Sequence, residues 1–178
     1  SVLAQASAPV LQIEGGVATV TLNRPAQRNR LENGDLKTLL AHFETIENHP
    51  DVRVLVLTAN TAGQPKPVFC AGYDIGGFDE PGHGATFFEE IPDTLAKLRP
   101  VTICALNGSV YGGATDLVLA CDFTVAQRGY TWRMPAAALG LHYGVEEQHG
   151  HGHDGDQSQR QAFERQPEGR QCGELVPV

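Results

Sequence analysis

The chain has 178 residues, of which 41% are apolar and 19% charged, and its formal net charge is −8. This length suits one domain with a sizeable core, and the negative charge argues against non-specific nucleic-acid binding. No apolar run is long enough to span a bilayer, the first residues lack a secretion-signal pattern, and the four cysteines form no C-x-x-C pair. We therefore expect a cytoplasmic protein with reduced thiols that binds neither nucleic acid nor membrane.

The N-terminal part predicts a β-hairpin followed by an amphipathic helix. Residues 10–13 and 17–22 are strand-like, and Gly15 and Gly16 lie in the turn between them. Pro25 ends the second strand. Asn33 is a plausible N-cap for a helix that stops before Pro50, and its apolar residues recur with a helical period: Leu36, Leu39, Leu40, Phe43 and Ile46.

The middle of the chain predicts a buried strand, a glycine-bearing turn and a second helix. Residues 52–57 read as a strand of the parallel, buried kind. A loop rich in glycine and proline then leads to the segment 68–74, which contains Gly72. The next helix is amphipathic and ends before Pro100, while Pro92 either kinks it or marks its start.

Residues 101–123 show the same order of strand, glycine-bearing turn and helix more clearly. An apolar strand at 101–106 runs into a turn, the pair Gly112–Gly113 follows, and residues 114–120 read as a helix with Asp116 in its first turn. A strand, a glycine turn and a helix start together present backbone N–H groups to negative charge. A short strand at 124–126 completes the pattern, which predicts an α/β fold with crossover connections.

The composition changes after residue 143. Residues 144–178 are rich in Gln, Glu, Gly, His and Arg and have few apolar residues. We therefore expect a core at 1–143 and a polar tail at 144–178 that is disordered or loosely attached. The histidines between His149 and His153 could bind a metal weakly, but flexible glycines between them do not fix ligand geometry, so we expect no metal site.

The two glycine turns, at residues 71–74 and 112–113, are the main chemical signal. Two backbone amides that converge on one oxygen make an oxyanion hole, which is often the largest single contribution to catalysis. Spacing alone does not distinguish such a site from two ordinary turns.

Several motifs together resemble the crotonase superfamily, also called the enoyl-CoA hydratase/isomerase family. The matching segments, in the family's order, are residues 21–25 with Asn29, 54–58, 69–75, 106–108, 112–113 and 117–122, and Pro135 with residues 139–140. The resemblance covers about residues 10–143 and implies an α/β spiral of β-β-α units. The helical C-terminal region of the family is then missing or replaced in this chain.

The resemblance also implies acyl-CoA thioesters as substrates and assigns roles to individual residues. The backbone amides of Tyr73 and Gly113 would hold the thioester oxygen and stabilise an enolate. Family hydratases carry two glutamates; Asp116 stands at the first position, and Ala136 follows Pro135 at the second. Asp116 would be the acid/base, and hydratase or isomerase chemistry is the expected class, since one carboxylate can shift a double bond.

Three further residues are implied for the CoA moiety, and one more for proton transfer. Arg28 is the favoured basic group, with the backbone of Ala71 and Gly72 beside it, and Arg24 is a weaker alternative. His142 could replace the second carboxylate because histidine titrates near neutrality. The resemblance implies a homotrimer or hexamer, and no separate cofactor because CoA is part of the substrate.

Two other functions stay open. One is another crotonase-type reaction, such as thioester hydrolysis or C–C bond cleavage, that uses His142 or a tail carboxylate. The other is a non-catalytic acyl-CoA-binding protein, because Ala136 cannot move protons and the family's C-terminal region is not recognisable.

Overall fold

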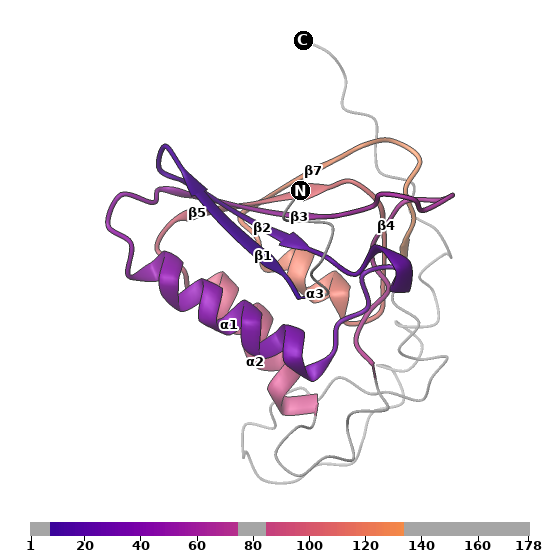
Figure 1. Cartoon of the computed structure of the whole chain (residues 1–178), viewed down its shortest axis with the longest axis horizontal. Coiled ribbons are helices and arrows are strands. Elements are labelled where there is room, and N and C mark those ends of the chain that lie inside the picture. Colours follow the sequence, from indigo (N-terminus) through magenta and orange to yellow (C-terminus); the bar gives the residue numbers. More distant parts are fainter. Residues whose placement is uncertain (1–7, 75–84, 134–178) are drawn as a thin grey trace, which may run out of the picture. The chain divides into compact units, whose positions relative to one another are not determined.

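The computed structural model describes residues 8–74 and 85–133, which form an α/β fold with two sheets (Figure 1). The strands are β1 (Val10–Glu14), β2 (Val17–Leu22), β3 (Val54–Ala59), β4 (Val68–Cys70), β5 (Val101–Leu106), β6 (Ser109–Tyr111), β7 (Phe123–Ala126) and β8 (Trp132–Arg133). The helices are α1 (Asn33–Glu47), α2 (Ala85–Ala96), α3 (Ala114–Leu119) and a short 3-10 helix, η2 (Pro25–Gln27). Within these described ranges, no helix has the length and apolar character needed to cross a membrane.

The larger sheet has the strand order β1-β2-β3-β5-β7. β1 and β2 are antiparallel and pair from Val10 with Thr21 to Glu14 with Val17, whereas the other pairs are parallel. The predicted hairpin is therefore confirmed. Its two turn residues, Gly15 and Gly16, have φ values of 56° and 82°, which glycine adopts without strain and which match the right-handed twist of a hairpin.

One face of the larger sheet forms the core. Buried side chains alternate along the central strands: Ala18, Val20 and Leu22 in β2, Leu55, Leu57 and Ala59 in β3, and Thr102, Cys104 and Leu106 in β5. Figure 1 shows α1, α2 and α3 on the same side of this sheet. The predicted strand at 52–57 begins and ends two residues later, and it alternates instead of being buried throughout, because the described helices cover a single face.

The predicted start of α1 was wrong by one residue. Asn33 is the first helical residue, and Glu32 is the N-cap. The Glu32 amide donates to Asp35 Oδ2 at 2.9 Å. The Asp35 side chain, at the third helical position, therefore supplies the hydrogen-bond partner for the backbone N–H of the N-cap residue. The helix ends at Glu47, before Pro50, and buries Leu36, Leu39, Phe43 and Ile46 as predicted, while Leu40 is half-buried.

The other helices follow the prediction with small shifts. α2 begins at Ala85 and ends at Ala96, and Pro92 lies inside it instead of marking its start. α3 ends at Leu119, with Ala120 as its C-cap.

The smaller sheet, with the order β4-β6-β8, was not predicted, and the segment 68–74 that contains β4 was predicted only as a glycine-bearing turn. Its strands are two or three residues long and pair in parallel, Val68 with Ser109 and Val110 with Trp132. Such short segments carry little sequence pattern and form only through partners that are distant in the chain. This sheet brings the ends of β4 and β6, and hence the two glycine turns, to the same edge.

Gly108 lets β4 and the turn before β6 approach closely. A Cβ at this position would lie 2.5 Å from the Phe69 nitrogen and 2.7 Å from the Val68 carbonyl carbon. Both are backbone atoms of β4, so the smaller sheet would have to shift to accept a side chain.

Replacement of Gly108 by alanine should therefore lower the free energy of unfolding by about 1–3 kcal/mol, the usual cost of overpacking. The measurement is urea unfolding followed by circular dichroism. Gly34→Ala is the matched control, because a Cβ at Gly34 in α1 meets nothing within 4 Å and should be neutral or slightly stabilising. Equal effects of the two substitutions would contradict this explanation of Gly108.

Candidate active site

The two predicted glycine turns lie directly against each other. β4 leads into Gly72 and β6 leads into Gly112, and the two strands are parallel neighbours. A Cβ at Gly72 would lie 3.2 Å from the Tyr111 carbonyl oxygen and 3.8 Å from Gly112 Cα. The φ values of Gly72 and Gly112 are 102° and 60°, so both turns favour glycine for conformation, and Gly72 is also favoured by the close approach of the Tyr111 carbonyl.

Backbone hydrogen bonds fix the first turn against the loop before α1. The Ala71 amide donates to the Arg28 carbonyl at 3.0 Å, and the Asp74 amide donates to the Leu31 carbonyl at 2.9 Å. In return, the Leu31 amide donates to the Gly72 carbonyl at 2.9 Å. These three bonds hold the peptide units on both sides of Tyr73 in place.

The second turn is fixed in a similar way. The Gly112 amide donates to the Arg133 carbonyl in β8 at 3.0 Å, and the Thr115 amide donates to the Gly112 carbonyl at 3.0 Å. Gly113 follows as the residue immediately before α3. The position of the Gly113 peptide is therefore set by the sheet on one side and by the first helical turn on the other.

A side chain at Gly113 would require the ring of Phe88 to move. A Cβ there would lie 2.6 Å from Cε1 of Phe88, a buried residue of α2. The Tyr73 ring packs against Phe88 with 5.3 Å between centroids, and the Tyr73 hydroxyl hydrogen-bonds to the Asn33 side chain. Phe88 thus contacts both glycine turns, a role that the sequence pattern did not reveal because it indicated only a core-facing residue of a helix.

Asp116 lies one helical turn after Gly113. Its amide donates to the Gly113 carbonyl at 3.0 Å, and its side chain is half-buried in the first turn of α3. A carboxylate at this place can accept and return a proton, and a negative charge in the first turn is favoured by the helix dipole.

Arg28 stands beside the second glycine turn. Its guanidinium carbon lies 5.6 Å from the ring centroid of Tyr111, the residue before Gly112, which is the geometry of a cation–π contact. Its backbone has φ 55° and accepts the Ala71 amide, while its side chain is exposed. The structure therefore places an accessible positive charge next to both turns. Tyr111 was missed from the sequence, since nothing in a three-residue strand marks an aromatic residue as a cation partner.

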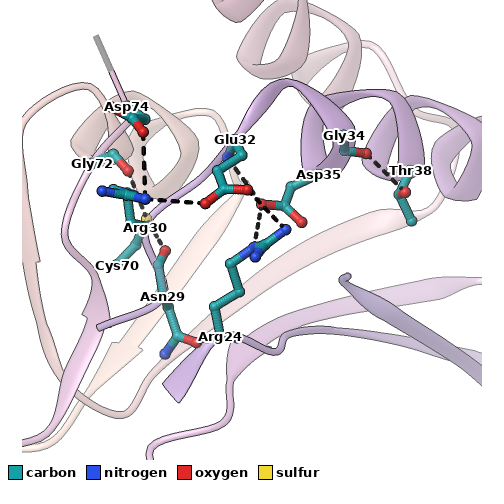
Figure 2. Close-up of polar contacts among 10 residues, drawn as sticks. All are labelled: Arg24, Asn29, Arg30, Glu32, Gly34, Asp35, Thr38, Cys70, Gly72 and Asp74. Atoms are coloured by element: carbon teal, nitrogen blue, oxygen red, sulfur yellow. Dashed lines mark hydrogen bonds and ion pairs between the residues drawn. The ribbon is translucent and has the colours of Figure 1, made fainter. Parts of the chain in front are cut away.

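Arg24, the weaker of the two arginine candidates, is held in an ion-pair network (Figure 2). Its Nε lies 2.8 Å from Asp35 Oδ2, and its terminal nitrogen lies 3.2 Å from Glu32 Oε2. The hydrogen bond to Asp35 raises the pKa of the Arg24 guanidinium above its ordinary value. Since the Asp35 side chain is 2% exposed, this pair fixes the start of α1 to the loop that carries Arg28.

Two more polar side chains support the first turn. Asn29 is buried and has φ 54°; its side-chain amide donates to the carbonyls of Asn60 and Val68, and its Oδ1 accepts the Arg24 amide. Arg30 bridges Glu32 and Asp74, the residue after Tyr73, as Figure 2 shows.

Cys70 packs in the core and is fully buried. Its thiol donates to the Asn29 carbonyl at 3.0 Å, and burial raises the pKa of the thiol to about 12. Arg133 is exposed on β8.

Several predicted residues lie outside the described ranges. These are Pro135, Ala136, His142 and Tyr143, the tail at 144–178 with its histidine run, and Ile75 of the first motif. Within the part of the chain that the structure describes, no three His, Cys, Asp or Glu side chains are grouped in a way that could hold a metal ion.

The strand order and the paired glycine turns define a crotonase-like α/β protein. The sequence model described as Enoyl-CoA hydratase/isomerase matches residues 12–147. The chain therefore belongs to the enoyl-CoA hydratase/isomerase family, and the resemblance noted from its motifs is confirmed.

Individual relatives agree with this assignment. The 2,3-dehydroadipyl-CoA hydratase of Escherichia coli is 33% identical over 70% of this chain and 48% of its own length. The 1,2-epoxyphenylacetyl-CoA isomerase of the same organism is 32% identical over 72% of this chain and 51% of its own. A solved enoyl-CoA hydratase/isomerase family member superposes with a TM-score of 0.68 and 27% identity, covering 78% of this chain and 55% of that one. The chain spans about half the length of these relatives.

Proposed function

We propose that this protein acts on acyl-CoA thioesters by stabilising a thioester enolate, in a reaction of the enoyl-CoA hydratase or isomerase type. One observation carries the proposal: the two glycine turns meet at Gly72 and Gly112, with 3.8 Å between an ideal Gly72 Cβ and Gly112 Cα. Two turns that touch can aim two backbone amides at one oxygen, which is the requirement for an oxyanion hole.

In the proposed mechanism the amides of Tyr73 and Gly113 donate to the thioester oxygen. Asp116 removes a proton from the carbon next to the thioester, or from the γ-carbon of an enoyl group, and the freed electron pair moves onto the oxygen held by the two amides. Return of the proton to a different carbon shifts the double bond. The fixed backbone on either side of both amides supports this role, because donors that need not reorganise stabilise a short-lived oxyanion best.

The number of carboxylates favours the isomerase branch over hydration. A double-bond shift needs one group that takes and returns the proton, which Asp116 can supply alone. Hydration in the family's two-carboxylate manner needs a second acid, and Ala136 stands at that position in the sequence.

Arg28 is proposed to bind the phosphates of CoA together with the backbone of Ala71 and Gly72. Its exposed guanidinium and its position over Tyr111 support this assignment. We propose no separate cofactor, since CoA belongs to the substrate, and we keep a homotrimer or hexamer and a cytoplasmic location as proposals.

Replacement of Arg28 by glutamine should weaken the binding of acyl-CoA about 5–30-fold, since a charge-assisted hydrogen bond to phosphate contributes on the order of 1–2 kcal/mol. The measurement is isothermal titration calorimetry at low and high salt, with a smaller loss expected at high salt. Arg128→Gln, in the exposed turn between β7 and β8, is the matched control and should bind as the wild type does. An equal loss in both variants would remove Arg28 from the site.

A non-catalytic acyl-CoA-binding protein is the second candidate function. Ala136, which stands at the position of the family's second glutamate and cannot move protons, favours it. Thioester hydrolysis or C–C bond cleavage with His142 or a tail carboxylate is a third possibility within the same site.

One set of assays separates these functions. The purified protein is incubated with an enoyl-CoA and with a saturated acyl-CoA in D₂O, and the products are followed by NMR and mass spectrometry. The proposal predicts double-bond migration or hydration, together with deuterium incorporation next to the thioester. Release of free CoA indicates the hydrolase; a rise in heat stability with acyl-CoA but no turnover indicates the binding protein. Absence of both turnover and binding refutes the proposed function.

A further inference from the structure

Phe88 of α2 contacts both residues whose amides are proposed to hold the thioester oxygen. Its ring packs against the Tyr73 ring, with 5.3 Å between the centroids and 37° between the ring planes. The same ring reaches Gly113, because a Cβ at Gly113 would lie 2.6 Å from Cε1 and 3.0 Å from Cζ of Phe88. A single side chain from α2 therefore joins the two halves of the proposed oxyanion hole.

The backbone of Gly113 does not itself require glycine. Its φ of −58° and ψ of −18° lie in the right-handed helical region, which any residue adopts. Gly72 and Gly112 differ from it, since their positive φ values favour glycine for conformation. The three atoms from other parts of the chain that lie nearest to a Cβ at Gly113 all belong to the Phe88 ring. The ring thus packs directly on the Gly113 backbone, next to its amide.

The core holds the Phe88 ring in place. Ile91 and Leu95 lie about one and two helical turns further along the same face of α2, and both are fully buried with Phe88 in the core. α2 packs in this way against both α1 and α3. Because protein cores are close-packed, the ring has little room to retreat, and its position limits where the Gly113 backbone can lie.

The Tyr73 side chain is held at its ring and at its tip. The hydroxyl hydrogen-bonds to the side chain of Asn33, the first residue of α1, while the ring packs on Phe88. A shift of the Tyr73 backbone would have to break this hydrogen bond or displace the Phe88 ring. The ring of Phe88 therefore constrains the first amide as well as the second.

We propose that Phe88 is a positioning residue that sets the separation of the Tyr73 and Gly113 amides, and thereby the polarisation of the thioester carbonyl. It acts through these two amides and moves no proton itself. The inference rests on the proposed function, since the amides matter only if they hold a thioester oxygen. Fixed donors are sensitive to position, and a misplacement of about 1 Å can cost about 10²-fold in rate.

Replacement of Phe88 by leucine should lower kcat for an enoyl-CoA about 10–100-fold and change KM less than about threefold, because it displaces the amides and leaves the CoA contacts in place. Leucine ends at Cδ and so lacks the two ring atoms closest to Gly113. In addition, the ¹³C resonance of a bound acyl-CoA labelled at the thioester carbonyl should move toward its position in water. Steady-state kinetics and NMR measure the two effects.

Phe43→Leu is the matched control, because Phe43 is fully buried in α1 and makes the same loss of a core ring. No Phe43 atom is among the nearest neighbours of a Cβ at Gly72 or Gly113. This variant should lower the midpoint of urea unfolding as Phe88→Leu does, with kcat and the carbonyl resonance as in the wild type. Equal losses of kcat in the two variants would overturn the positioning role.

A size exchange tests the contact from the other side. Gly113→Ala alone should lower both kcat and the urea midpoint, because its methyl group meets the Phe88 ring. In the Phe88→Leu background the closest ring atoms are gone, so the double variant should have a higher kcat and a higher urea midpoint than Gly113→Ala. Strictly additive losses would overturn the proposal. If Phe88→Leu does not fold, recovery of folding in the double variant supports the contact, and no recovery overturns it.

These measurements separate the positioning role from the proposed function. The carbonyl resonance reports polarisation without any reaction, so it decides even if the wild type binds acyl-CoA and does not turn it over. A wild type that fails to bind, or whose bound thioester resonates as in water, refutes the oxyanion hole and the role of Phe88 with it. A polarised carbonyl that Phe88→Leu leaves unchanged overturns the role of Phe88 alone.

Discussion

Replacement of Asp116 by asparagine should lower the turnover of an enoyl-CoA by about 10²–10⁴-fold, the usual contribution of a positioned acid/base. The amide keeps the shape of the side chain but cannot accept and return a proton. Binding of the acyl-CoA should change little, because the proposed oxyanion donors and Arg28 are untouched. Steady-state kinetics and calorimetry on the same preparations measure the two effects separately.

Two further variants make this prediction specific. Asp116→Glu supplies the residue usual in the family and should retain turnover, since it keeps the carboxylate. Asp93→Asn removes an exposed carboxylate from α2 and should leave turnover unchanged. Turnover by Asp116→Asn equal to that of the wild type would exclude Asp116 as the acid/base.

Replacement of Arg24 by methionine should lower the free energy of unfolding by about 3–5 kcal/mol, which is the cost of leaving a buried charge without its partner. Asp35 is the residue left behind; its side chain is 2% exposed, and Arg24 Nε lies 2.8 Å from its Oδ2. The loop that carries Arg28 and Asn29 should loosen with it. Chemical unfolding and amide hydrogen exchange of residues 24–36 measure the two consequences.

A double-mutant cycle distinguishes this pairing from a general loss of packing. Asp35→Asn in the Arg24→Met background removes the buried charge and should recover part of the lost stability. Arg30→Gln is the matched control, because Arg30 is 44% exposed and its pairs with Glu32 and Asp74 are screened by water, so its loss should cost less than about 1 kcal/mol. Equal losses for Arg24 and Arg30, or strictly additive effects of Arg24 and Asp35, would contradict the buried pair.

The sequence predicted those parts of the fold that depend on local periodicity. The hairpin follows from alternating residues around Gly15 and Gly16, and the helical spacing of Leu36, Leu39 and Phe43 located α1. The N-cap was missed because glutamate is not one of the residues that usually cap a helix. The Asp35 side chain accepts the hydrogen bond of the Glu32 amide, so the cap position does not need such a residue. β4, β6 and β8 were missed because they are short and exist only through pairing with distant strands.

The candidate site, too, was predicted only in part. The two glycine turns were recognisable, since Gly72 and Gly112 adopt positive φ and have no local substitute. Sequence periodicity could not predict that the two turns contact each other, because the contact depends on the parallel pairing of β4 with β6. The contacts of Phe88 with Gly113 and of Arg28 with Tyr111 join residues from different elements, and no spacing rule predicts which side chains meet there.

The central claim is that the amides of Tyr73 and Gly113 polarise the thioester carbonyl of a bound acyl-CoA. The most direct measurement is the ¹³C NMR resonance of an acyl-CoA labelled at the thioester carbonyl, recorded free and bound to the Asp116→Asn protein, in which turnover should be slow. A carbonyl that accepts two hydrogen bonds in an oxyanion hole should resonate downfield of the free thioester. Saturable binding with the carbonyl resonance at its position in water would contradict the claim.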